Sequence, residues 1–305
     1  MSKEYRMGKA NLEVFSETLQ GLAEKNRDLL VATSDSRGSG KLVPFGERFP
    51  EQIIEIGIAE QNLVGVSAGL ASTGKIVFAV SPACFLATRA LEQIKNDIAY
   101  SDQPVKLIGI SAGVSYGALG STHHSLHDYA AMRAINNLTL LAPADNLETR
   151  RCIELASEMD SPMYIRFGKK PMPDLHDEHT EFVIGNGIRL KDGDDLAFIA
   201  TGECVYPALL AAEKLEAEQG LKARVISMHT IKPLDKEIIM EAANQCRAMV
   251  TIEEHSVHGG LGEACAAYLL QNGYTGPFRI MGIPDEYTVT GSQSDIFNHY
   301  GISGE

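Results

Sequence analysis

The chain has 305 residues, which is enough for two domains that each bury a hydrophobic core. Hydrophobic residues make up 44% and charged residues 22%, a composition that is typical of a folded protein and excludes a disordered one. The net charge of -13 argues against a nucleic acid or an anionic membrane as partner, because both would repel the chain.

The sequence also bears on location and cysteine chemistry. It holds no apolar run of membrane-spanning length, and its first residues lack the apolar core of a signal peptide. We therefore expect no membrane partner and a cytoplasmic location. The five cysteines are scattered and form no Cys-x-x-Cys pair, so neither a disulfide framework nor a thiolate zinc site is expected.

The first expected elements are a helix, a buried strand and a polar loop. Apolar residues recur at helical spacing from Leu12 to Leu22 and predict one apolar helix face. Residues 29–33 have the pattern of a buried strand, which ends just before Asp35. A loop rich in Gly and Ser is expected over residues 36–40.

A second strand end and a helix surround Glu60. Residues 53–56 are a short apolar run that Gly57 interrupts, and a helix with small residues along one side is expected next. Glu60 lies in the first turn of this helix, where a carboxylate complements the positive end of the helix dipole. Such a carboxylate usually has no further role, and functional ones are the minority.

The first half of the chain continues the alternation. Further strands are expected at 75–80, 105–110, 138–141 and 162–167, and helices at 85–100, 126–135 and 146–159, the last capped by Asp145. Residues 111–125 form a long loop rich in Gly, Ser and His, of a kind that is usually functional or mobile. Alternating strands and helices imply a parallel sheet with ligands at the carboxyl ends of its strands.

The second half repeats this pattern. The composition changes to Lys, Pro, Asp and His between Gly168 and Thr180, which indicates a linker. Strands are expected after it at 196–200, 223–227, 249–253 and 278–281, and helices at 205–219, 235–246 and 262–270. The sequence therefore predicts two consecutive α/β domains with parallel sheets, over residues 1–170 and 185–305, joined by a linker over 171–184.

Three histidines lie within five residues of the segment Gly120-Ser-Thr-His-His-Ser-Leu-His-Asp128. His123 and His127, with Asp128, could hold a zinc ion if they shared a helix face, but Gly120 favours a loop at His123. Solvated or capping histidines and a substrate or cofactor contact are the other interpretations, and an imidazole suits proton transfer near neutral pH. No metal-ligating residue is assigned.

Six motifs occur in the order found in transketolases. They are Gly57-Ile-Ala-Glu-Gln-Asn62 with Ser67-Ala-Gly-Leu-Ala71, Phe85 with Arg89-Ala-Leu-Glu-Gln93, Ala112-Gly-Val, Gly120-Ser-Thr-His, Pro143-Ala-Asp145 and Ile252-Glu-Glu-His-Ser-Val-His-Gly-Gly-Leu-Gly262. Over nearly its whole length the chain resembles the pyrimidine-binding and C-terminal domains of that family. The resemblance implies a thiamine diphosphate enzyme that transfers a two-carbon ketol unit from a ketose, such as a sugar phosphate, to a carbonyl acceptor.

The resemblance also assigns roles to single residues. Glu60 would be catalytic, because it would hydrogen-bond the ring nitrogen of the cofactor's aminopyrimidine and share a proton with it. Phe85 would pack on the same ring, with an ordinary core Phe as the alternative. The other assignments are Arg89 and Asp35 at the cofactor, His123 at the reacting centre and the substrate, and Ser39, Leu119, Arg166 and Lys169 at the substrate, the last two at its phosphate.

Three positions depart from the family's pattern. Pro82 stands where a second aromatic residue is common, and His124 replaces a Gln. Leu119 stands where an acidic residue usually contacts a substrate hydroxyl. Because an apolar side chain cannot hydrogen-bond a hydroxyl, we expect an unusual or branched sugar such as apulose 4-phosphate as substrate.

The Gly-Asp-Gly motif through which thiamine enzymes bind diphosphate and Mg²⁺ does not occur in the sequence. The similar string at 191–195 precedes a strand, and no helix follows it to bind phosphate. The resemblance therefore implies a partner subunit that supplies the diphosphate and Mg²⁺ site, in a heterotetramer with two copies of each chain. The alternative functions are the β subunit of a 2-oxoacid dehydrogenase decarboxylase and a non-catalytic regulatory protein on the same fold.

Overall fold

Seven strands form the sheet of the first half of the molecule. The structure is a computed structural model and describes residues 5–304. The strand order is β12-β6-β7-β5-β4-β2-β3, and every neighbouring pair is parallel except β12 with β6. The strands are β2 Leu29–Thr33, β3 Ile53–Glu55, β4 Ile76–Pro82, β5 Lys106–Ile110, β6 Thr139–Leu141, β7 Met163–Arg166 and β12 Thr230–Lys232. The predicted parallel α/β arrangement is confirmed.

Helices cover both faces of this sheet. They are α1 Asn11–Ala23, α2 Val43–Arg48, α3 Glu60–Ala71, α4 Ala83–Arg89, α5 Leu91–Gln93, the π-helix η1 Ile94–Tyr100, the 3₁₀ helix η2 Gly117–Thr122, α6 Asp128–Arg133 and α7 Asn146–Glu158. Side chains alternate along each strand, so Val77 of β4 packs with α3 and α4 in one core while Phe78 packs with α1 and α7 in the other. A core on each face is what a buried parallel sheet requires.

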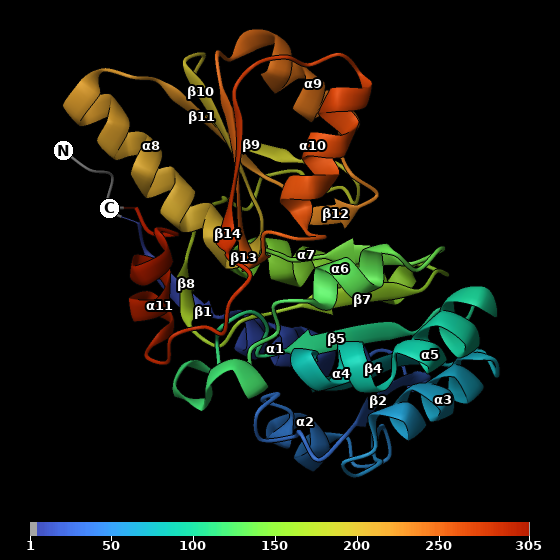
Figure 1. Cartoon of the computed structure of the whole chain (residues 1–305). Helices are drawn as coiled ribbons and strands as arrows, with labels where there is room; N and C mark the ends of the chain where they lie inside the picture. The colour runs from blue at the N-terminus through green and yellow to red at the C-terminus, as the bar shows by residue number, and fades with distance from the viewer. Residues whose placement is uncertain (1–4, 305) are drawn as a thin grey trace.

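A second sheet forms the other half. Its order is β14-β13-β10-β11-β9, with β9 antiparallel to β11 and the other pairs parallel. The elements are β9 Ile188–Lys191, β10 Leu196–Ala200, the 3₁₀ helix η3 Gly202–Cys204, α8 Val205–Gln219, β11 Ala223–Ser227, α9 Lys236–Gln245, β13 Met249–Ser256, α10 Leu261–Gln271, β14 Phe278–Ile283 and α11 Gln293–Tyr300. One face packs on α8 and α11, and the other on α9 and α10 (Figure 1).

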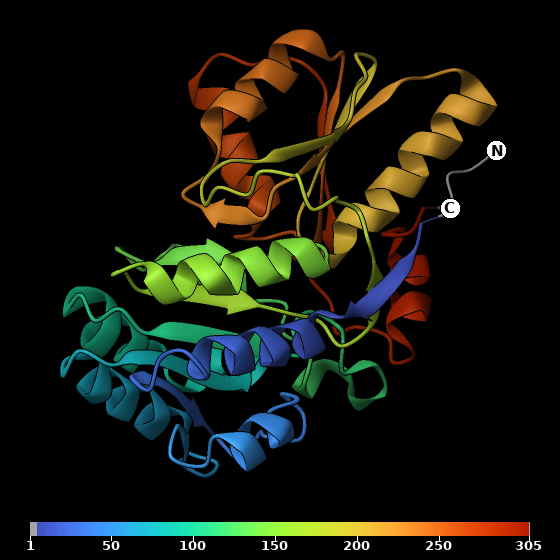
Figure 2. The ribbon, with the colours of Figure 1, turned by 180° about the vertical axis from the view of Figure 1, so that it is seen from behind.

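Two small strand pairings connect segments that are far apart in the sequence. β1, Met7–Ala10, pairs antiparallel with β8, Pro171–Pro173, and both views place this ribbon beside α11 (Figures 1 and 2). β12 follows β11 of the second sheet, yet it pairs with β6 at the edge of the first. The segment expected to be a linker thus begins with a strand, and the second half of the chain supplies one strand of the first sheet.

The structure differs from one expected helix and confirms two other expected features. The single helix expected over 85–100 is divided into α4, α5 and η1. The expectation for the start of α3 is confirmed, since Glu60 is its first residue, and so is the cap of α7, where the Asp145 side chain accepts a hydrogen bond from the Glu148 amide. Among residues 5–304, no helix is long and apolar enough to cross a membrane.

Candidate active site

Glu60 and Arg89 form an ion pair at the carboxyl ends of the parallel strands. Glu60 follows β3 and is only 4% exposed, while Arg89 ends α4, which follows β4. Arg89 Nη1 donates a hydrogen bond of 2.9 Å to Glu60 Oε1. The buried carboxylate therefore has a cationic partner in addition to the positive end of α3.

Phe85 is the second neighbour of Arg89. The Arg89 guanidinium carbon is 4.2 Å from the centroid of the Phe85 ring, which is within the range of a cation–π contact. Arg89 thus touches both side chains that the sequence assigned to the aminopyrimidine. A carboxylate can hydrogen-bond a ring nitrogen, and an aromatic side chain can stack on a ring. Together they suit a flat, nitrogen-containing ring.

His123 contacts two aromatic rings. Its centroid is 5.4 Å from that of Phe85 and 5.4 Å from that of Tyr116, and both contacts are edge-on, at 70° and 71°. Its Nδ1 lies 3.0 Å from the hydroxyl of Thr122. These contacts fix the plane of the imidazole.

Lys169 reaches the same group of side chains through Tyr116. Its Nζ lies 4.6 Å from the centroid of the Tyr116 ring, which also contacts His123. Burial, and then the charge of Lys41, lower the pKa of Lys169. The structure therefore brings Glu60, Arg89, Phe85, His123 and Lys169 into one continuous row, in which Tyr116 is the member that the sequence analysis missed.

Arg166 does not belong to this row. It is 5% exposed and donates from Nη1 to Asp128 Oδ1 and from Nη2 to the Glu254 carbonyl, each at 2.8 Å. Its guanidinium also lies 4.1 Å from the centroid of the Tyr129 ring. A buried guanidinium held this way cannot turn to a substrate phosphate without leaving Asp128 unpaired.

Asp35 and Ser39, which follow β2, and Leu119, in η2 after β5, lie outside the row. Asp35 is exposed, with a φ of 52°, and its amide donates to Glu55 Oε1 at 2.6 Å. Ser39 donates to the Ser36 carbonyl at 3.2 Å, and Leu119 is 55% exposed. Over residues 5–304, none of the hydrogen bonds joins these three side chains to the row.

The two other histidines of the cluster differ in their surroundings. His124 is buried and bonds to the Gly117 carbonyl and to Thr288, whereas His127 is exposed at the start of α6. Within the described part of the chain, no group of three or more His, Cys, Asp or Glu side chains is arranged to hold a metal ion. The string at 191–195 lies between β9 and β10, before a strand as expected.

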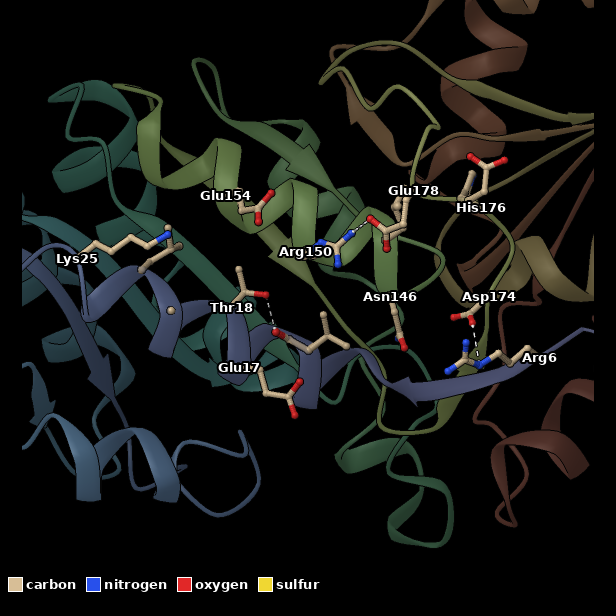
Figure 3. Close-up of a pocket in the computed structure, with 15 residues that line it drawn as sticks. Arg6, Glu17, Thr18, Lys25, Asn146, Arg150, Glu154, Asp174, His176 and Glu178 are labelled. Carbon is tan, nitrogen blue, oxygen red and sulfur yellow. Dashed lines mark hydrogen bonds and ion pairs between the residues drawn. The ribbon is translucent and has the colours of Figure 1, made fainter.

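A separate groove of about 640 Å³ lies between α1, α7 and the segment after β8 (Figure 3). Four of its charged side chains form two ion pairs, Arg150 with Glu178 at 2.5 Å and Arg6 with Asp174 at 3.9 Å. None of the residues of the Glu60 row lines it. The groove is therefore not the candidate active site.

The fold and the row of side chains define a pyrimidine-binding α/β unit followed by a second α/β domain. The family model "Transketolase, pyrimidine binding domain" matches residues 8–173, and "Transketolase, C-terminal domain" matches residues 185–305. The chain belongs to the transketolase family.

Several relatives match the chain over almost its full length. An apulose-4-phosphate transketolase subunit of Phocaeicola vulgatus is 46% identical over 292 residues, which cover 95% of this chain and 93% of the relative. The putative transketolase C-terminal section of Methanocaldococcus jannaschii is 40% identical, over 95% of this chain and 92% of its own. These matches favour a transketolase subunit over the 2-oxoacid dehydrogenase and non-catalytic alternatives.

A solved structure agrees with this assignment. The split gene transketolase described as an inactive β4 tetramer has a TM-score of 0.86 and 38% identity, and the match covers 97% of this chain and 95% of that one. The chain is a transketolase subunit, and its family implies thiamine diphosphate as cofactor.

Proposed function

We propose that this chain is the pyrimidine-binding subunit of a two-subunit transketolase that transfers a two-carbon ketol unit between sugars. The buried Glu60 carboxylate, with Arg89 at 2.9 Å and the Phe85 ring beside Arg89, carries the proposal. When bound, thiamine diphosphate supplies the nucleophilic carbon and the electron sink for cleavage of the ketose. The chain's own residues bind, orient and exchange protons around it.

Glu60 is the proposed catalytic residue. Its buried carboxyl group would exchange a proton with the ring nitrogen of the aminopyrimidine. Phe85 orients the same ring by packing on its face, and Arg89 balances the charge of Glu60. Asp35, which follows β2, is a further proposed cofactor contact.

His123 and Lys169 are the proposed substrate residues. His123, held by Phe85 and Tyr116, would hydrogen-bond the sugar's oxygen atoms. Lys169 binds the phosphate of the sugar as a point charge. Ser39, in the segment after β2, and the exposed Leu119, in η2 after β5, would line the approach to the site.

Apulose 4-phosphate is the proposed sugar substrate. Two relatives bear that name, at 46% and 38% identity over more than nine-tenths of this chain. Leu119 supports the proposal, because an apolar side chain leaves room for a branched carbon and offers no hydrogen bond to a hydroxyl.

A partner subunit is part of the proposal. It would supply the diphosphate and Mg²⁺ site, in a heterotetramer of two copies of each chain. The proposal is supported by residues 5–304, in which no group of three or more His, Cys, Asp or Glu side chains is arranged to hold a metal ion. We propose a cytoplasmic location and domain boundaries of 1–170 and 185–305, with residues 171–184 between them; the ranges of the two family models support these boundaries.

Calorimetric titration tests the proposal. Thiamine diphosphate with Mg²⁺ should bind tightly to the chain mixed with a partner that carries the Gly-Asp-Gly motif, and weakly to the chain alone. Glu60→Gln should lower ketol transfer by about 10²- to 10⁴-fold because it removes the proton exchange. The exposed Glu51→Gln is the control. Tight binding by the chain alone would refute the need for a partner subunit. Full activity of Glu60→Gln would refute the catalytic role of Glu60.

A further inference from the structure

The loop of residues 111–125, here called the His123 loop, follows a strand of the first sheet but packs against the second domain. Val114 of this loop is fully buried in the second domain's core, together with Ile283 and Phe297. Its amide donates a 2.8 Å hydrogen bond to Glu254 Oε1 at the end of β13. The first turn of the loop is therefore anchored on the C-terminal domain.

Gln293, the first residue of α11, holds this anchor in place. Its side-chain Nε2 donates to Glu254 Oε1 at 2.8 Å and to Glu203 Oε2 at 2.7 Å. All three side chains are buried. Burial, and then the charge of Glu203, raise the pKa of Glu254 to about 8. Its Oε1 accepts from both Gln293 and the Val114 amide, so Glu254 offers Val114 a fixed acceptor.

Thr288 is the second point of contact, and it lies next to His123. Its Oγ1 is 2.6 Å from His124 Nδ1 and 3.0 Å from Ser121 Oγ, while His124 Nε2 is 3.0 Å from the Gly117 carbonyl. Thr288 is 8% exposed and His124 3%. One hydroxyl of the C-terminal domain thus contacts the residues on both sides of His123.

The directions of these hydrogen bonds follow from the acceptors. Burial lowers the pKa of His124, so its imidazole is neutral near pH 7 and carries one N–H. A carbonyl can only accept, so Nε2–H donates to Gly117 and Nδ1 accepts from the Thr288 hydroxyl. Thr288 Oγ1 then accepts from Ser121. The Thr288 hydroxyl thus serves both neighbours, because it donates to one and accepts from the other.

The backbone also approaches closely here. Gly117 has a φ of 51°, and a β-carbon on it would lie 2.6 Å from the Gly291 carbonyl oxygen. The loop therefore cannot shift toward the 284–291 segment, and its position is set by the C-terminal domain.

We propose that the C-terminal domain takes part in ketol transfer by positioning the His123 loop, with Thr288 as the positioning residue that fixes His123 and Leu119 relative to the substrate. The inference rests on the proposed function, since it assumes that the loop meets the sugar. Thr288 itself touches no member of the Glu60, Arg89 and Phe85 group in the described hydrogen bonds, so it acts on the substrate side of the site.

The pair Thr288→Val and Thr288→Ser tests this role. Valine has nearly the shape of threonine but removes both hydrogen bonds, whereas serine keeps the hydroxyl. In the enzyme assembled with its partner, Thr288→Val should raise KM for the sugar about tenfold and lower kcat, with thiamine diphosphate affinity unchanged. Thr288→Ser should stay within about twofold of the parent. Amide hydrogen exchange over residues 117–124 should be faster in Thr288→Val than in the parent, and should be unchanged in Thr288→Ser.

The outcomes separate the two proposals. An inactive parent enzyme with the correct partner refutes the proposed function, and this inference with it. An active parent with Thr288→Val at parental KM and kcat refutes only the positioning role, as does an equal loss of cofactor affinity and of sugar affinity. If Thr288→Val does not fold, Ser121→Ala removes the outer hydrogen bond alone and should give a smaller rise in KM; no rise would refute the role.

Discussion

At the scale of single residues, burial separates the two basic side chains that end the first sheet. Arg166 is enclosed by Asp128, Tyr129 and Glu254, whereas Lys169 is exposed with its amine above Tyr116. Moving a buried guanidinium leaves a buried carboxylate unpaired, but a surface ammonium changes partner at little cost. Although Arg166 and Lys169 are close in sequence, one is a buried, paired cation and the other is an exposed cation that can change partner.

Lys169→Met should weaken binding of phosphorylated sugars. A charge-assisted hydrogen bond is worth roughly 1.5–3 kcal/mol, so KM for the sugar phosphate should rise about ten- to a hundredfold. Lys169→Arg should retain most of the affinity because the charge remains. Steady-state kinetics with a phosphorylated and an unphosphorylated ketose would measure the difference, which should be confined to the phosphorylated one.

Arg166→Met serves as the matched comparison. It should lower the free energy of unfolding by about 3–5 kcal/mol, because Asp128 would be left buried without its cation. Urea unfolding of both variants would test this, with Lys169→Met close to the parent. The reverse result, a stable Arg166→Met with raised KM and a Lys169→Met with parental KM, would assign the phosphate contact to Arg166.

At the scale of elements, the sequence was sufficient where the signal is local. Helices α1 and α7, strand β2 and the start of α3 follow from apolar spacing, the Asp145 cap and Gly57. β12 and β8 have three residues each, and their pairing partners lie 89 or more residues away, so no local pattern marks them. The division of residues 83–100 preserves the apolar spacing and so leaves the sequence pattern of one helix.

The candidate site shows the same limit. Glu60, Phe85, Arg89, His123 and Lys169 each stand in a motif or next to a strand end, and the sequence named them all. Their order in a row and the insertion of Tyr116 between His123 and Lys169 depend on the packing of loops from different strands. The contacts of Thr288 with a loop more than 160 residues away are equally non-local.

His176 ties the segment after β8 to the start of α7, at the edge of the groove in Figure 3. Its Nδ1 lies 2.9 Å from Asp145 and its Nε2 3.3 Å from Glu148, and its side chain is 1% exposed. Burial alone lowers the pKa of His176, but the carboxylates of Glu148 and Asp145 together outweigh burial and raise it. The start of α7 therefore contacts a buried imidazole whose charge depends on pH.

His176→Asn should therefore reduce stability more at about pH 6 than at about pH 9. Because the folded pKa is above the unfolded value near 6.5, the stabilisation is complete below that value and is lost as pH rises through the folded pKa. Urea unfolding at both pH values would measure this, with the exposed His179→Asn as control. An effect of His176→Asn that grows with pH would contradict the charged pairing.

At the scale of the whole molecule, the two halves are joined by contacts that neither half could make alone. β12 extends the first sheet, Arg166 binds the Glu254 carbonyl, and Val114 enters the second core. His229, just before β12, stacks on Phe182 with centroids 4.2 Å apart. The His123 loop is thereby held by residues of both domains, so a loss of contact between the domains should change the candidate site.

Acid should weaken this junction through His229. Burial, and then the charge of His176, lower the pKa of His229 to about 3, so the folded state keeps the imidazole neutral while the unfolded chain takes up a proton near pH 6.5. Stability should fall as pH drops from about 6.5 to about 3, with His229 contributing a slope of up to about 1.4 kcal/mol per pH unit.

His229→Leu should remove this part of the slope in urea unfolding between about pH 4 and pH 6.5, opposite in sign to the effect of His176. Amide exchange in β12 and β6 should also rise in acid before exchange in α9 does, since the junction opens first. Equal slopes for the parent and His229→Leu would show that another buried group controls the acid limb.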